Sequence, residues 1–348
     1  MNANSNQMHK PIRKLFTFLC CIASIAMYGQ YTETINSNRP GESQGAFAVG
    51  TQVIQVETGF DLGNDTHSLL NTDIDITAFN LDLRYGFWKE ALEVNAFFRY
   101  QSNNIAFTTG SSDTRRVSGL ENLQLGAKYL IYDPYKKGED EPNLYSYHAN
   151  FKFKWKTLIP AVSVYAGGVF DLSNELDTRR EEGISPNIAI ITQNNWGRWV
   201  WVNNIIADRI TAEFPGYSWI TTMTHSATEK IAFFAEYQLI TGDLYADNLI
   251  RGGGAYLLTK NLQVDISGLV NFKDTPSRWN VAAGLSWRLD LHKKDETIED
   301  TSGDDEKGDD KKKKKTASQR QAEKINKKNK KKRRDSVDPD GGDDGGNL

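Results

Sequence analysis

The sequence is poor in cysteine. Two of its 348 residues are cysteines, the neighbours Cys20 and Cys21. Both fall in an apolar run, residues 15–27, that follows a basic stretch at residues 10–14. The run fits the core of a secretory signal and is shorter than the ~20 residues that a membrane-spanning helix needs. We therefore predict a signal peptide over residues 1–29, rather than an anchor helix, and an exported protein without disulfides.

Histidine is also scarce, and no two histidines have the spacing of a zinc or iron site. The pair His225 and Ser226 is the nearest approach to an activated nucleophile, but neighbours in a strand point to opposite faces. The carboxylate-bearing stretch 71–75 is more simply a solvated loop than a calcium site. We therefore predict no catalytic residue, no metal ion, no cofactor and no enzymatic activity. The histidines are His9, His67, His148, His225 and His292.

Apolar residues almost vanish from residues 292–348, where acidic patches alternate with basic blocks at 311–315 and 327–334. Such a segment buries too little apolar surface to offset its ordering entropy, so we predict a disordered charged tail. Its lysines have the chemistry of nucleic-acid binding, but an exported protein is in the wrong compartment. We expect no nucleic-acid partner, and a periplasmic protein or the cell wall as the tail's partner. The net charge of −3 is a near-cancellation that says little about partners.

Between the two ends the dominant pattern is alternation with a period of two. Ile54, Val56 and Phe60 share one face of the first segment, and Gln55 and Glu57 share the other. This is a strand with one apolar and one polar side, and its length of roughly ten residues suits a strand that crosses a bilayer. We count about twelve such strands. They cover residues 52–62, 77–87, 92–101, 122–131, 231–240, 248–258, 262–272 and 279–289, and less cleanly 159–170, 186–193, 198–208 and 217–226.

The connections between these strands alternate in length. Every second one is short, as at 88–90 and 227–229, and the intervening ones are longer, as at 102–119 and 171–183. This asymmetry is typical of an outer-membrane barrel whose termini lie on the short-turn, periplasmic side. The connection 133–156 is long although it belongs on the short-turn side.

A soluble β-sandwich or lipocalin-like barrel is the alternative, because its strands also alternate. Glycine and charge gather on the polar faces here, as expected around a wet lumen. Aromatic residues gather near strand ends, which suits interfacial girdles. We therefore predict an all-β protein with a single antiparallel transmembrane β-barrel over residues 51–291. The aromatic residues near strand ends include Tyr85, Phe87, Trp88, Trp196, Trp199, Trp201, Tyr217, Trp219, Trp279 and Trp287.

Charged residues of both signs occupy the polar faces. A ring of one sign would indicate ion selectivity, and none is visible. The charges either pair across the barrel and close it, because unpaired charges are costly in a confined site, or line a conducting lumen. The predicted lumen and gate residues are Arg39, Glu57, Asp82, Arg84, Glu93, Arg99, Lys128, Glu236, Arg251, Asp265 and Arg288.

Three stretches resemble a known family: SNRPGESQGAFAVG running into GTQVIQVETGF, LDLRYGFWKEALEV, and SGLENLQLGAKYLIYD. They resemble the putative MetA-pathway of phenol degradation family of outer-membrane barrels, and the resemblance covers about residues 36–291. Asn38 and Asn122 stand where relatives often have aspartate. The resemblance implies an outer-membrane barrel with an uptake or channel role.

The glycine-rich stretch SNRPGESQGAFAVG, residues 37–50, is not a phosphate-binding loop, because a strand rather than a helix follows it. We predict that residues 30–50 form a periplasmic segment that enters the lumen as a plug, rather than a mere linker. Charge-assisted pairing would offset the cost of ordering it. Arg39 is expected to reach lumen carboxylates such as Glu57 or Asp82.

These expectations together predict a passive channel or uptake transporter in the outer membrane of a Gram-negative cell. It would be surrounded by outer-membrane lipid and would carry small molecules, hydrophobic or aromatic ones among them. The alternative is a non-conducting structural barrel that anchors periplasmic partners through its charged tail. The sequence names no permeant.

Overall fold

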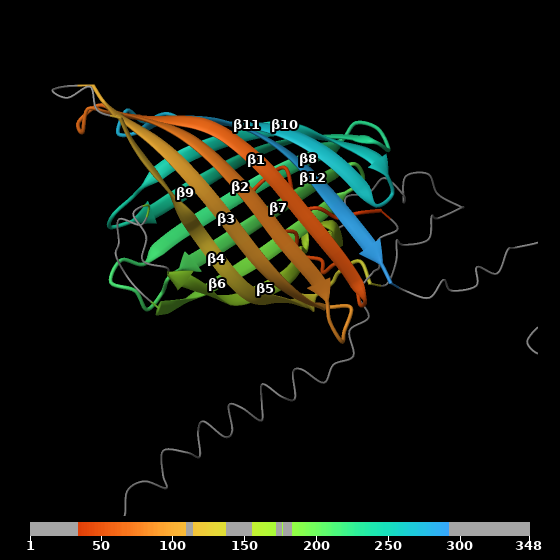
Figure 1. Cartoon of the computed structure of the whole chain (residues 1–348). Coiled ribbons are helices and arrows are strands. Elements are labelled where there is room, and N and C mark those ends of the chain that lie inside the picture. Colours follow the sequence, from red (N-terminus) through yellow and green to blue (C-terminus); the bar gives the residue numbers. More distant parts are fainter. Residues whose placement is uncertain (1–33, 109–113, 137–154, 172–175, 177–182, 292–348) are drawn as a thin grey trace, which may run out of the picture. The chain divides into compact units, whose positions relative to one another are not determined.

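The computed structural model describes residues 34–108, 114–136, 155–171, 176 and 183–291 (Figure 1). The predicted signal peptide and tail, and most of the 133–156 connection, lie outside the described residues. Within the described ranges, no helix is long and apolar enough to cross a membrane.

Twelve antiparallel strands form one closed barrel, in which each strand pairs with its neighbours in the chain and β1 pairs with β12. This confirms the predicted all-β barrel of about twelve strands. A short 3-10 helix, η1 (Trp155–Leu158), precedes β5. The strands are β1 (Val53–His67), β2 (Thr72–Gly86), β3 (Leu92–Phe107), β4 (Thr114–Tyr132), β5 (Ala161–Asp171), β6 (Gly183–Trp196), β7 (Trp199–Asp208), β8 (Gly216–Ser226), β9 (Ile231–Gly242), β10 (Asp247–Thr259), β11 (Leu262–Asn271) and β12 (Ser277–Asp290).

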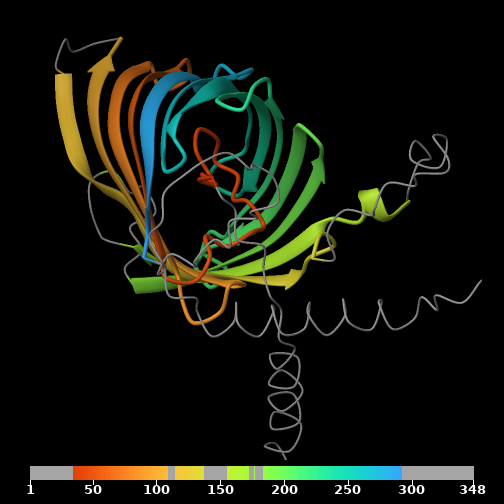
Figure 2. The same cartoon turned by 90° about the vertical axis from the view of Figure 1, so that its right-hand side faces the viewer.

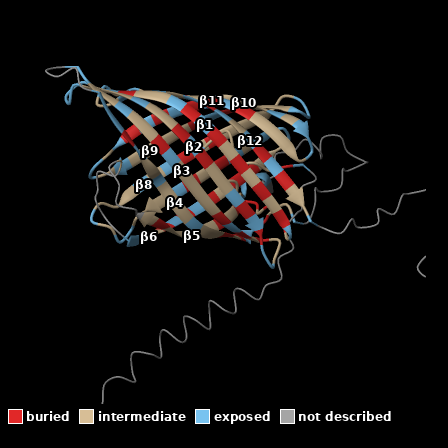
Figure 3. Cartoon of the chain, viewed as in Figure 1, coloured by how far each residue is buried: buried red, intermediate tan, exposed pale blue. Residues whose placement is uncertain are grey.

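The barrel is polar inside and apolar outside. In β1, Gln55 and Glu57 are 0% and 1% exposed, whereas Phe60 and Leu62 are both 49% exposed. The same alternation of buried and exposed residues runs along the other strands (Figure 3). A soluble β-protein would bury the apolar phase and expose the polar one. The arrangement found here instead suits an outer surface in contact with lipid.

Several strands, β1 to β4 among them, are longer than the alternation predicts. We expected a long loop at residues 102–119, but β3 continues to Phe107 and β4 begins at Thr114, with Ser102 opposite Ser118. Polar residues occupy both faces of this extension, so its hydropathy pattern fades although the strand pairing continues. The predicted contrast between long and short connections is also weaker, since residues 68–71 separate β1 from β2 at the end where long loops were expected.

The chain from residue 34 to residue 50 lies inside the barrel (Figure 2). We call this segment the plug. The mouth at which β1 begins and β12 ends is the terminal mouth, and the other is the far mouth. The plug starts at the terminal mouth, where Ile35 N donates to Lys260 O at 2.9 Å. It returns there to join β1, where Gln52 N donates to Gly86 O at 3.0 Å.

Candidate functional site in the barrel lumen

The plug has an apolar stem, Ala46 and Phe47, and a polar tip, residues 37–45. Ala46 and Phe47 are buried in a hydrophobic cluster on the barrel wall. Burial of a large apolar side chain stabilises by about 1.5–3 kcal/mol, so the stem anchors the plug. The other buried members of the cluster are Ala91, Leu130, Ala161, Tyr165, Ala189, Ile191 and Val202.

Two lumen carboxylates hold the backbone of the tip. Glu57 accepts the N–H groups of Asn38 and Arg39, each with its nearest oxygen at 3.2 Å, and the Ser37 hydroxyl at 2.9 Å. Glu236 accepts the N–H groups of Glu42 at 3.1 Å and Ser43 at 3.3 Å. Backbone donors that water would otherwise satisfy are therefore paired with charges built into the barrel wall.

Lumen cations hold the plug through its carbonyl groups. Arg84 Nη1 donates to Asn36 O at 2.9 Å, and Lys128 Nζ donates to Gly45 O at 2.9 Å. Arg288 Nη1 donates to Thr34 O at 3.0 Å. These bonds come from β2, β4 and β12, so the plug is held from several sides of the barrel.

The Arg39 side chain lies at the seam where the barrel closes. Its Nε and Nη2 donate to the carboxylate of Asp265 at 3.4 and 3.2 Å. The guanidinium rests on Gly59 of β1 and Gly284 of β12, which face each other in the strand register. A β-carbon on either glycine would overlap the guanidinium. The two glycines therefore form a cradle that only residues without a side chain can make.

The Arg39 side chain reaches a lumen carboxylate, as predicted, but not one of the two that were given as examples. It pairs with Asp265 rather than with Glu57 or Asp82. Glu57 binds the backbone of the tip and forms an ion pair with Arg84 instead. The glycine cradle explains the difference, because it directs the guanidinium along the β1–β12 seam toward β11.

We expect Gly284→Ala to displace the Arg39 guanidinium and to lower the free energy of unfolding by about 1.5–3 kcal/mol, the usual contribution of a hydrogen bond to a charged group. Thermal unfolding in detergent would measure the loss. Gly216→Ala is the matched control, because a β-carbon there lies 4.0 Å from the Asp208 Cβ and meets nothing closer. Equal midpoints for the two variants would contradict a role for the cradle.

The other predicted charges form buried ion pairs. Arg84 pairs with Glu57 and Glu93, each at 2.9 Å, and Lys128 pairs with Glu93 at 3.3 Å. The side chains of these four residues are at most 1% exposed. Removing one partner from such a group leaves an uncompensated buried charge. The mixed signs in the sequence thus correspond to compensation within the lumen rather than to a ring of one sign.

Two further pairs complete the set of predicted residues. Arg99 pairs with Asp61 at 2.9 Å nearer the far mouth, and Arg251 pairs with Glu236, the carboxylate that holds the tip. Asp82 takes no part in these networks, and its Oδ1 is buried without a hydrogen-bond partner among the described residues.

Uncharged residues that hold the plug were missed from the sequence. Asn204 accepts Gln44 N at 2.6 Å and donates to Gln44 O at 2.9 Å. Gln193 accepts Ala46 N at 2.9 Å, and Ser163 donates to Ala46 O at 2.5 Å. They lie on β5, β6 and β7, the strands with the least clean alternation. Their only signal was a polar side chain in the inward phase of an otherwise apolar strand.

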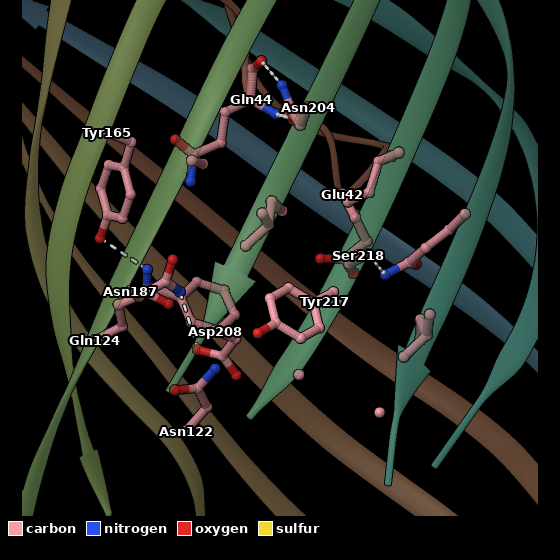
Figure 4. A pocket seen from close by; sticks show the side chains of 18 of the residues that line it. Glu42, Gln44, Asn122, Gln124, Tyr165, Asn187, Asn204, Asp208, Tyr217 and Ser218 are labelled. Carbon is pink, nitrogen blue, oxygen red and sulfur yellow. Dashed lines mark hydrogen bonds between the residues drawn. The ribbon is translucent and has the colours of Figure 1, made fainter. Parts of the chain in front are cut away.

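The plug lies between two cavities, and Asn38, Arg39 and Gly41 line both of them. The cavity toward the far mouth, which we call the far cavity, has a volume of about 380 Å³. The cavity toward the terminal mouth has a volume of about 280 Å³. Figure 4 shows polar side chains from several strands converging on the far cavity. Both volumes suit small molecules rather than polymers.

The far cavity also meets residues of the far-mouth loops. Tyr245 lines it and donates a hydrogen bond from its phenol to Asp247. Burial raises the pKa of the Tyr245 phenol, which therefore stays a neutral donor. Among the described residues, no group of three or more histidine, cysteine, aspartate or glutamate side chains could hold a metal ion.

A closed antiparallel barrel with an apolar outer surface and a polar, plugged lumen defines a membrane-spanning β-barrel. The chain belongs to the family described as "Putative MetA-pathway of phenol degradation", whose model matches residues 37–289. The match runs from the plug tip into β12, which confirms the resemblance seen in the sequence.

Similar solved structures share little sequence with the chain. The COG4313 outer membrane channel from Pseudomonas putida F1 is 11% identical, covers 73% of this chain and 100% of its own, and has a TM-score of 0.48. The Pseudomonas putida toluene transporter TodX is 8% identical, with coverages of 76% and 99% and a TM-score of 0.40. No curated protein matches the sequence. At this level of similarity the neighbours say nothing about what the chain carries.

Proposed function

We propose that the protein is a passive outer-membrane channel for small molecules, whose bore is set by the plug. The observation that carries the proposal is the way the plug is held. Its stem is anchored by apolar burial, whereas its tip is bound by hydrogen bonds and ion pairs between two cavities. Because water can replace hydrogen bonds but cannot replace apolar packing, opening of the channel would release the tip while the stem stays in place.

The outer membrane is the proposed location, because closed barrels of this type with an even number of antiparallel strands are found there. The terminal mouth would then face the periplasm, as in single-chain bacterial barrels. The family's description names phenol degradation, which supports small aromatic compounds among the permeants.

Reconstitution into liposomes tests this function. We expect the full-length protein to give a measurable single-channel conductance and to increase the flux of small aromatic solutes. A variant that lacks residues 292–348 should conduct equally, because residues 34–291 already supply the closed barrel and its plug. The alternative is a non-conducting barrel that anchors periplasmic partners through its tail. It would be favoured if neither protein conducts and if a periplasmic partner co-purifies with the full-length protein but not with the tail-deleted variant.

A further inference from the structure

The far cavity has two chemically different walls. Asp82, Asn95 and Asn122 line it from β2, β3 and β4, and Ile206 and Ile220 line it from β7 and β8. Figure 4 shows Asn122, Gln124, Tyr165 and Asn187 gathered on the polar side. Asn204, Asp208 and Ser218 interrupt the second wall, and the isoleucines between them can contact an apolar body whose polar end meets the first wall.

The polar wall offers hydrogen-bond acceptors that nothing satisfies. The Oδ1 atoms of Asp82, Asn95, Asn122 and Asn187 are buried and have no hydrogen-bond partner among the described residues. Asn187 is 6% exposed, and its Nδ2 donates to Asp208 at 3.1 Å, which fixes its amide oxygen as the free group. Buried polar atoms normally have a partner, so a cluster of free acceptors around one cavity points to a ligand that donates.

Among the described carboxylates that line the far cavity, Asp82 and the exposed Asp243 have no ion pair, and of these two Asp82 has a buried oxygen atom. Glu57 is paired with Arg84, and Asp208 is paired with Arg209 at 2.6 Å. The Glu42 carboxylate lies 3.6 Å from Arg251. Asp82 has no such ion pair, because its neighbours Arg84 and Lys128 are engaged by Glu57 and Glu93. A positively charged ligand group would complete this site.

We propose that the far cavity binds a small organic cation, in which an ammonium group on an apolar body meets Asp82 and Asn187 while the body contacts the isoleucines. The ammonium supplies three hydrogen-bond donors and no acceptor, which matches a wall of free oxygens. The cavity volume of about 380 Å³ lies near the lower end of the range for small-molecule pockets, which is room enough for an aromatic ring. The inference rests on the proposed channel function and names the substrate class of that channel.

The test uses three probes of one shape on the purified full-length protein in detergent: 2-phenylethylammonium, neutral 2-phenylethanol and anionic phenylacetate. Isothermal titration calorimetry is expected to show the tightest binding for the ammonium and the weakest for phenylacetate. Asp82→Asn should weaken ammonium binding about tenfold or more, because the carboxylate that accepts from the ammonium is replaced by a neutral amide. The same substitution should change the affinity for 2-phenylethanol less.

Asp75→Asn is the matched control. Asp75 lies on the same strand, is exposed and does not line the far cavity, so its substitution removes one charge from β2 and should leave binding unchanged. Heat-modifiable gel migration would confirm that both variants are folded. Asn187→Ala should also weaken ammonium binding, which keeps the test available if Asp82→Asn does not fold.

Three results would overturn the inference: no binding of the ammonium to the folded protein, binding of phenylacetate as tight as that of the ammonium, or equal affinities for the Asp82→Asn and Asp75→Asn variants. Binding is measured without transport, so the two proposals can fail separately. Conductance without ammonium binding would refute the cation site alone. Ammonium binding without conductance would refute the channel alone.

Discussion

Deleting residues 37–45 should raise the single-channel conductance several-fold. The deletion removes the plug tip with Arg39 but keeps the stem, Ala46 and Phe47, in its apolar cluster. The two cavities on either side of the tip would then join, because Asn38, Arg39 and Gly41 line both. Planar-bilayer recording of the purified variant measures the effect. Barrel integrity would be checked by heat-modifiable migration.

Glu42→Gln is the control for this deletion. The Glu42 side chain is 48% exposed and its ion pair with Arg251 is long, at 3.6 Å, so its charge adds little to the docking of the tip. Its conductance should equal that of the unaltered protein. Arg39→Ala should fall between the two, because it releases the cradle contact while the backbone bonds to Glu57 remain. Unchanged conductance after the deletion would mean that the segment is a linker and not a gate.

Arg84→Met should lower the free energy of unfolding of the barrel by about 3–5 kcal/mol, the usual penalty for leaving a buried charge without its partner. The substitution would leave Glu57 without its ion-pair partner and Glu93 with Lys128 alone, in a part of the lumen where both carboxylates are 1% exposed. It would also remove the bond to the Asn36 carbonyl. A lower unfolding midpoint, followed by gel migration against temperature, is the measurement.

Arg99→Met provides the comparison for Arg84→Met. The Arg99 side chain is 20% exposed, and Asn80 Nδ2 still donates at 2.8 Å to the Asp61 that Arg99 leaves behind. Arg99→Met should therefore lower the free energy of unfolding much less than Arg84→Met does. Adding Glu57→Gln to Arg84→Met should restore part of the lost stability, because the charge that has lost its ion pair disappears while Glu93 keeps Lys128. Equal costs for the two single variants would contradict the importance of burial at Arg84.

The strands could be predicted from the sequence because lipid outside and polar groups inside impose a period of two. The pattern is strong where the outer face must be apolar, as from Ile54 to Leu62, and it identified all twelve strands. It fades where both faces of a strand are polar, as in residues 102–107 of β3. The ends of the strands were therefore less predictable than their existence.

The inward direction of the charged residues also follows from alternation, but their partners do not. Arg39 and Asp265 are far apart in the chain, and their pairing depends on the closure of β12 onto β1. Gly59 and Gly284 read in the sequence as ordinary strand glycines. Their shared role becomes visible only when the register places them opposite each other.

The position of Arg39 also bears on how the barrel assembles. The guanidinium spans the first and last strands, so its cradle does not exist until β12 has paired with β1. Contacts between residues as far apart in sequence as Thr34 and Arg288, which are separated by 254 positions, form late because their chain segments must first be brought together. Docking of the plug and closure of the seam are therefore expected to be one cooperative event. The chain would begin its insertion as an open sheet without a docked plug, and the plug would take its place only at the final step of folding.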